Sequence, residues 1–122
     1  DPGCVTLVGQ SGGGAKIATL MAMPAAAGLF HRAVTMSGQQ VTASGPLNAT
    51  RRAEVWLEAL GLTPDRIDAV RTLPVERLIE AAGATDPILG GGLYFGPVLD
   101  GRSLDRHPFW PDAPAQSATV RT

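Results

Sequence analysis

The sequence has a single cysteine, no long apolar run and almost no net charge, and each absence excludes a class of protein. Because Cys4 is the only cysteine in 122 residues, no disulfide can form within the chain. No apolar run reaches the roughly 18 residues that a membrane-spanning helix needs. A formal net charge of −1 gives no reason to expect nucleic-acid binding. The hydrophobic content of 44% indicates a globular chain of about one domain in size.

The main feature of the sequence is a turn with a serine at its apex, Gly9–Gly13, which reads Gly-Gln-Ser-Gly-Gly. The apolar run Val5–Val8 before it predicts a strand, and the residues after it predict a helix over about Gly13–Met23. Gly-x-Ser-x-Gly between a strand and a helix is typical of a nucleophile elbow, in which the serine has a strained backbone. Backbone N–H groups and the helix dipole would favour negative charge there, such as an oxyanion. We expect a Cβ at either Gly9 or Gly13 to collide with the neighbouring strand or helix.

Two other glycine-rich motifs do not fit these residues. A phosphate-binding P-loop requires Gly-Lys-Ser/Thr after four variable residues, but Ala15 follows Gly14 and Lys16 comes one position late. A dinucleotide-binding fingerprint that starts at Gly12 would need a glycine where Ile17 stands. We therefore expect no nucleotide or other cofactor, and no metal site.

A second strand is predicted over Ala33–Met36, so residues 1–38 should form a strand–helix–strand unit with parallel strands. The first strand, over Cys4–Val8, does not alternate polar and apolar residues, which is typical of a central strand covered on both faces. Cys4 would then be a small buried hydrophobic residue. The helix between the strands is apolar nearly all round, which indicates that it is buried.

An amphipathic surface helix is predicted over Ala49–Leu60. Either Asn48 or Thr50 would cap its start, and Gly61 would end it as the C-cap. The charged residues of its solvent-facing side are Arg51, Arg52, Glu54 and Glu58.

The rest of the chain predicts two shorter helices, a loop and a tail. The helices should span residues 63–73 and 74–82, with Thr63 as the N-cap of the first. The glycine-rich residues 84–93 should form a mobile loop. Residues 95–101 should be extended and end in an Asp-Gly turn at Asp100, and the proline-containing tail after them should be mostly irregular.

Three stretches resemble, in order, the signatures of the type B carboxylesterases, a family that includes bacterial para-nitrobenzyl esterases, cholinesterases and some lipases. They are Asp1–Gly14, Gly28–Gly38 and Phe95–Gly101. The resemblance implies an α/β-hydrolase fold, of which this chain would hold an incomplete sheet. It also implies that residues 1–122 are an internal part of one catalytic domain. Residues 1–38 would be its strand–elbow–helix–strand core, 39–93 a helical insertion and 94–122 an extended segment.

The resemblance also implies roles at the matching positions. Ser11 matches the nucleophile, and the backbone N–H of Gly12 matches one donor of the oxyanion hole. Ser37 matches a serine that hydrogen-bonds near the triad acid and histidine, although a simple strand-end cap explains it equally well. Gln10 stands where cholinesterases have a glutamate, so Gln10 and Ser37 would lie around the reacting groups rather than among them.

A catalytic triad also needs an acid and a histidine, and neither is identified here. His31 should have a structural or surface role, because the resemblance places it in a signature whose residue is not catalytic. Like His31, His107 precedes the place where the family's acid and histidine would come. Asp100 is better explained by its turn. The candidate acids by residue type alone are Asp86, Asp105 and Asp112. We therefore expect that this chain requires the rest of its own domain and is inactive alone.

The predicted function is that of a serine ester hydrolase, which cleaves small uncharged carboxylic esters through an acyl-enzyme on Ser11. Two alternatives remain open at this point. One is a non-catalytic, cholinesterase-like interaction protein, and the other is an inactive truncated product. The first would be expected to lack the nucleophile, whereas Ser11 is present.

Overall fold

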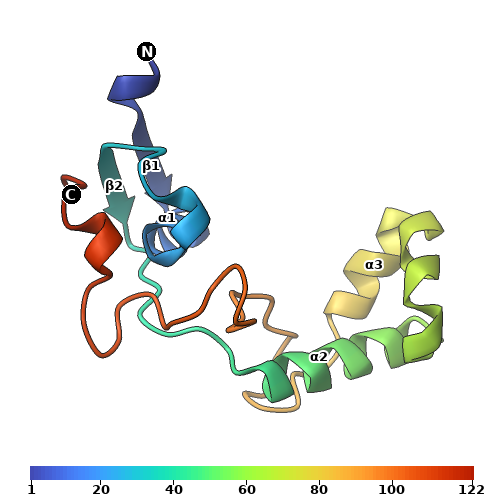
Figure 1. The fold of residues 1–122 in the computed structure, drawn as a ribbon. Helices are drawn as coiled ribbons and strands as arrows, with labels where there is room; N and C mark the ends of the chain where they lie inside the picture. The colour runs from blue at the N-terminus through green and yellow to red at the C-terminus, as the bar shows by residue number, and fades with distance from the viewer. The chain divides into compact units, whose positions relative to one another are not determined.

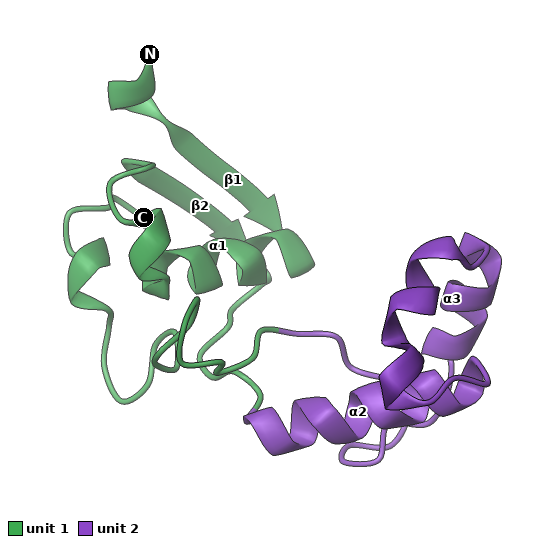
Figure 2. Ribbon diagram, turned by 45° about the vertical axis from the view of Figure 1, so that its right-hand side comes forward, with its two compact units in different colours: residues 1–44, 97–122 green, residues 45–96 purple.

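The computed structural model describes residues 1–122, which divide into two compact units (Figures 1 and 2). Unit 1 comprises residues 1–44 and 97–122, and unit 2 comprises residues 45–96. Each unit buries its own apolar side chains. Those of unit 1 include Ile17, Met21, Phe30 and Ala33, and those of unit 2 include Leu57, Leu60, Ala81 and Leu93.

Unit 1 is built on a pair of parallel strands joined by a helix. Strand β1 (Thr6–Gln10) leads into helix α1 (Gly12–Ala22), and strand β2 (Arg32–Met36) returns beside β1. The register places Gln10 opposite Met36, so both strands end at the same edge of the sheet. The predicted strand–helix–strand order and the parallel pairing are confirmed.

Helix α1 lies along one face of the sheet (Figure 2), and five of its eleven residues are buried. Only Gly12 and Lys16 of this helix are exposed, which confirms the prediction that it is buried. On the other face, Val8 of β1 is 65% exposed and Val34 of β2 is 45% exposed. Within these residues, therefore, β1 is covered on one face and not on the two that its apolar sequence favours.

The residues before β1 differ from the prediction. Pro2–Cys4 forms a turn of 3-10 helix (η1), because the Asp1 carboxylate accepts a hydrogen bond from the Gly3 N–H at 2.8 Å. Cys4 therefore lies outside the strand and is exposed, so the prediction of a buried cysteine is wrong. Its Sγ accepts a hydrogen bond from Arg32 Nη1 at 3.2 Å.

The tail of unit 1 is mostly irregular, as predicted, but its end joins the sheet. Arg121 forms a parallel bridge with Arg32 of β2. The Ala33 N–H donates to the Arg121 carbonyl at 2.8 Å, and the Arg121 N–H donates to the His31 carbonyl at 3.2 Å. At its start, β2 is thus paired on both of its edges.

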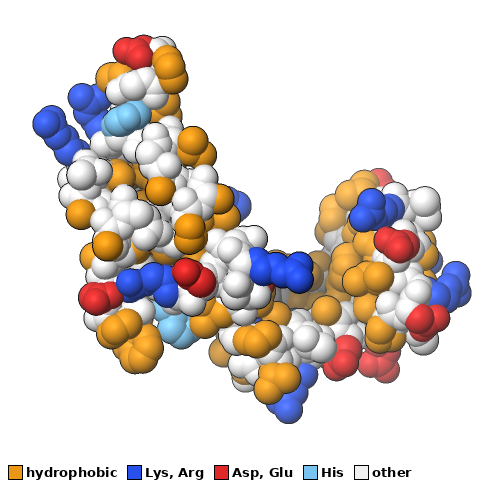
Figure 3. Space-filling model, in the orientation of Figure 1, with side chains coloured by type: hydrophobic (Ala, Val, Ile, Leu, Met, Phe, Trp, Pro, Cys, Tyr) orange, Lys and Arg blue, Asp and Glu red, His pale blue; other side chains and the backbone are white.

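Unit 2 contains helix α2 (Pro46–Ala59), the 3-10 segment η3 (Pro64–Thr72) and helix α3 (Val75–Ala82). Two hydrogen bonds join the C-terminal part of α2 to α3. Trp56 Nε1 donates to the Leu78 carbonyl at 3.3 Å, and Arg77 Nη2 donates to the Leu60 carbonyl at 3.0 Å. Apolar side chains lie among the charged ones on the surface of this unit (Figure 3).

Helix α2 begins three residues earlier than predicted. Its N-cap is Gly45 and proline occupies its first position, where the missing N–H costs nothing. Neither Asn48 nor Thr50 is the cap, and the Thr50 hydroxyl donates to the Pro46 carbonyl at 3.0 Å. At the other end Leu60 is the C-cap, and Gly61 follows it with a φ of 72°.

Candidate active site

Ser11 lies between the end of β1 and the start of α1 and has an unusual backbone. Its φ is 51° and its ψ is −119°, a conformation that side chains strongly disfavour. The turn is held by two hydrogen bonds. The Ser11 N–H donates to the Met36 carbonyl at 2.7 Å, and the Ser11 carbonyl accepts from the Ala15 N–H at 3.0 Å. The Ser11 side chain is exposed and does not cap the helix that follows it.

The turn depends on glycines that lie close to neighbouring backbone atoms. A Cβ at Gly9 would be 2.5 Å from the Gly13 carbonyl carbon and 2.8 Å from the Gly14 nitrogen. A Cβ at Gly14 would be 2.8 Å from the Gly38 oxygen, and one at Gly38 would overlap the Ser11 carbonyl oxygen. The prediction for Gly9 is confirmed. The prediction for Gly13 is wrong, because a Cβ there would meet nothing within 4 Å.

The first turn of α1 offers hydrogen-bond donors beside Ser11. Gly12 is the first residue of the helix, so its backbone N–H has no carbonyl one turn before it to bond with. The helix dipole adds partial positive charge at this end. An oxyanion formed on a carbonyl carbon attached to Ser11 would therefore find a donor at Gly12.

The structure brings a second serine to the same edge of the sheet. Because Gln10 pairs with Met36, Ser11 and Ser37 occupy equivalent positions just after the two strands. Ser37 also has a positive φ, of 50°, and like Gln10 its side chain is exposed. Nothing in the sequence around Ser37 indicated this conformation, which lets Gly38 reach the Ser11 carbonyl.

The two histidines have structural contacts. His31 precedes β2, at the opposite end of the strands from Ser11, and its Nδ1 accepts from the Val5 N–H at 3.3 Å. His107 Nδ1 accepts from the Ala43 N–H at 3.0 Å. The His107 ring also stands edge-on to Trp110, with ring centroids 5.6 Å apart. Neither histidine hydrogen-bonds to Ser11, which agrees with the structural role expected for His31.

The chain matches one known protein family along nearly its whole length. Residues 1–120 match the model of the carboxylesterase family. The chain belongs to the carboxylesterase family. The resemblance carried by the three sequence signatures is confirmed by this match.

Individual relatives in the carboxylesterase family cover most of the chain. Para-nitrobenzyl esterase of Bacillus subtilis (strain 168) is 37% identical over 113 residues, which are 88% of this chain and 22% of that protein. Phenmedipham hydrolase of Pseudarthrobacter oxydans is 39% identical over 118 residues, with the same shares of each chain. The chain thus spans about a fifth of the length of these curated relatives.

Solved structures of the family show the same fold. A PNB esterase structure superimposes with a TM-score of 0.75 and 36% identity, covering 88% of this chain and 24% of the other. The structural neighbours are α/β-hydrolases, so the predicted fold class is confirmed.

Two acidic residues of this carboxylesterase-family chain, Asp100 and Asp112, bind nearby groups of the tail. Asp100 Oδ1 accepts from the backbone N–H groups of Arg102, Ser103 and Leu104 at 3.0, 2.9 and 3.0 Å. These bonds, chiefly the one from Leu104, lower the pKa of Asp100 to about 2. Asp112 pairs with Arg106 Nη2 at 2.6 Å. The prediction that Asp100 serves its turn is confirmed.

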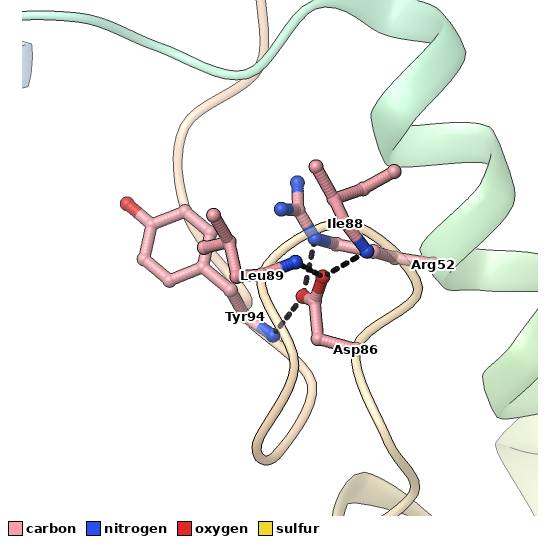
Figure 4. Close-up of polar contacts among 5 residues, drawn as sticks. All are labelled: Arg52, Asp86, Ile88, Leu89 and Tyr94. Carbon is pink, nitrogen blue, oxygen red and sulfur yellow. Dashed lines mark hydrogen bonds and ion pairs between the residues drawn. The ribbon is translucent and has the colours of Figure 1, made fainter.

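One buried charge pair in unit 2 has no signal in the sequence. Arg52 Nε lies 2.5 Å from Asp86 Oδ2, and both residues are buried (Figure 4). The prediction that Arg52 lies on the solvent-facing side of its helix is wrong. Helical periodicity groups Arg52 with its charged neighbours. It does not reveal Asp86, the partner of Arg52, which lies 34 residues away in the sequence.

Unit 1 also has an apolar cavity of about 570 Å³. It lies between α1 and the tail, with Met21, Gly38, Phe109 and Pro114 among its walls, and no charged side chain lines it. Ser11 is not part of its lining, so the cavity does not mark the chemistry of the elbow.

Among the helices, none is both long and apolar enough to cross a membrane.

Proposed function

We propose that this chain carries the nucleophile of a serine ester hydrolase and that Ser11 attacks the carbonyl carbon of a carboxylic ester. The observation that supports this most directly is the backbone of Ser11. A serine is held at a φ of 51° between a parallel strand and a helix, in a turn packed around Gly9, Gly14 and Gly38. Strain of this kind, fixed by the surroundings, is found at functional sites.

The proposed reaction passes through an acyl-enzyme. Ser11 Oγ bonds to the ester carbonyl carbon as a general base takes its proton, and the Gly12 N–H donates to the resulting oxyanion. The alcohol leaves with a proton, and water then hydrolyses the acyl group from Ser11. We propose that the base is a histidine in the rest of the domain, because neither His31 nor His107 contacts Ser11 and each accepts a backbone hydrogen bond elsewhere, from Val5 and from Ala43.

We propose small, uncharged carboxylic esters as the substrates. One relative is named a para-nitrobenzyl esterase and another a phenmedipham hydrolase, and both cover 88% of the chain. These names favour hydrolysis over the alternatives of an interaction protein or an inactive product. Gln10 and Ser37 would then support the elbow without taking part in bond making.

The experiment that tests this treats the full-length protein with a fluorophosphonate probe and identifies the labelled peptide. Trypsin cleaves after Lys16 and after Arg32 and Arg51, so Ser11 and Ser37 fall on different peptides. We expect the label on the peptide that ends at Lys16, and loss of both label and ester hydrolysis in Ser11→Ala.

The Ser37→Ala variant is the matched control, because Ser37 has a similar φ and a similar exposure at the end of the neighbouring strand. It should still be labelled at Ser11. Label on residues 33–51, or label that persists in Ser11→Ala, would show that another residue is the nucleophile.

A further inference from the structure

Residues 86–94, here named the Asp86 loop, are closed by a single carboxylate (Figure 4). Asp86 Oδ1 accepts from the backbone N–H groups of Ile88 and Leu89, both at 2.9 Å. Asp86 Oδ2 accepts from the Tyr94 N–H at 3.0 Å and from Arg52 Nε at 2.5 Å. One side chain therefore joins the beginning of the loop, its end and helix α2.

The charges in this cluster are removed from water. Asp86 is 2% exposed and Arg52 is 7% exposed. The Arg52 guanidinium carbon lies 5.4 Å from the centre of the Tyr94 ring, so the loop covers its own anchor. A buried charge is tolerated when it is paired and hydrogen-bonded, and removing one partner leaves the other uncompensated. Each charge in the cluster thus depends on the other.

The residues of the loop before Leu93, which is itself buried in unit 2, have little else to order them. Gly90 and Gly91 have φ values of 72° and 69°, and glycine gives up more conformational freedom on ordering than any other residue. Leu89 at the tip is 71% exposed. Besides the carboxylate, the loop has backbone bonds between Asp86 and Gly91 and between Gly90 and Asp86, and a bridge between Thr85 and Gly92.

The helices of unit 2 have contacts of their own that do not involve the loop. The bonds from Trp56 to Leu78 and from Arg77 to Leu60 link α2 with α3. After the loop, the Phe95 ring meets Trp56 edge-on at 6.0 Å. These contacts between α2 and α3 do not depend on residues 86–92.

We propose that the Arg52–Asp86 ion pair is a latch, which holds the Asp86 loop in one conformation on α2. Loss of the charge on Asp86 releases residues 87–92, ahead of the buried Leu93, while α2 and α3 stay folded. The latch is distinct from the proposed chemistry at Ser11, which lies in the other unit, and it holds whether or not the protein hydrolyses esters.

Amide hydrogen exchange of the full-length protein tests the latch. Asp86→Asn keeps the shape of the side chain and one acceptor oxygen but removes the charge. We expect exchange at Ile88 and Leu89 to become faster by about tenfold or more, while amides in the middle of α2 keep their protection. The matched control is Asp100→Asn, the same substitution in another turn closed by a carboxylate, which should leave the Asp86 loop unchanged.

Two results would overturn the proposal. Unchanged exchange at Ile88 and Leu89 in Asp86→Asn would show that the charge does not hold the loop. Equal acceleration in the loop and in α2 would show that the pair supports the whole unit. If Asp86→Asn does not fold, the double variant Arg52→Met/Asp86→Asn leaves no lone charge buried. It should also show the faster loop exchange, and a protected loop in this variant would equally refute the latch.

Discussion

Alanine at Gly9 and alanine at Gly13, on either side of Ser11, should change the free energy of unfolding in opposite directions. A Cβ at Gly9 would lie 2.5, 2.7 and 2.8 Å from backbone atoms of Gly13 and Gly14. Carbon contacts are comfortable at about 3.5–4.0 Å, so β1 and α1 would have to separate by about 1 Å. Backbone cannot rotate away as a side chain can. We expect Gly9→Ala to lower the free energy of unfolding by about 1–3 kcal/mol, the usual cost of overpacking.

Gly13→Ala is the matched control. It lies in α1, its φ is not positive, and an added Cβ would meet nothing within 4 Å. Alanine is favoured over glycine within a helix by about 0.5–1 kcal/mol, so this variant should be more stable than the wild type. Urea unfolding of the full-length protein, followed by circular dichroism, measures both changes.

Activity should separate the two variants more strongly than stability does. A shift of about 1 Å at Ser11 would cost about 100-fold in the rate of ester hydrolysis, because attack needs close alignment. Gly9→Ala should show this loss under conditions where it is fully folded, and Gly13→Ala should not. The reasoning is refuted if Gly9→Ala is as stable and as active as the wild type, since β1 and α1 would then not be in such close contact.

Three further outcomes are expected. Folding lowers the pKa of Asp100 to about 2 and that of Asp86 further, so both stabilise the fold above their unfolded pKa near 3.8. That contribution is lost as pH falls through the folded values, so the stability difference between wild type and Asp100→Asn should shrink from pH 7 to pH 2 in thermal melts. Ile17→Ala removes a core side chain and should cost about 2–5 kcal/mol by urea unfolding, whereas the exposed neighbour Lys16→Ala should stay within about 0.5 kcal/mol. Residues 1–122 alone should show no cooperative melt by circular dichroism, because a two-stranded sheet is marginal in water. A sharp transition would contradict this.

The elbow and its flanking elements could be predicted because their signals are local. A strand, a Gly-x-Ser-x-Gly turn and a helix follow one another within β1 and α1, and each has a pattern readable in a short window. Exact boundaries are harder to predict than the elements themselves. Helix α2 begins three residues before its predicted start, because Pro46 at its first position outweighs the caps that Asn48 or Thr50 offer.

The contacts that fix the site are between residues far apart in sequence, and these were missed. Gly38 packs on the Ser11 carbonyl, and Gly14 packs on Gly38, only because β2 returns in register beside β1. The sequence predicts Asp86 only as a candidate catalytic acid, on the basis of its residue type. In the structure its carboxylate closes a loop and pairs with Arg52. Side-chain type alone does not reveal which of several aspartates has a partner.

Arg121 pairs with the outer edge of β2 at its start, whereas β1 pairs with β2 alone and has one unpaired edge. The side of β1 away from β2 presents free N–H and C=O groups, next to the exposed side chain of Val8. Such an edge is a template on which another copy of the chain can add a strand. When these residues are produced alone, self-association along β1 is therefore the expected route to insolubility. A lysine in place of Val8 would discourage it without touching the elbow.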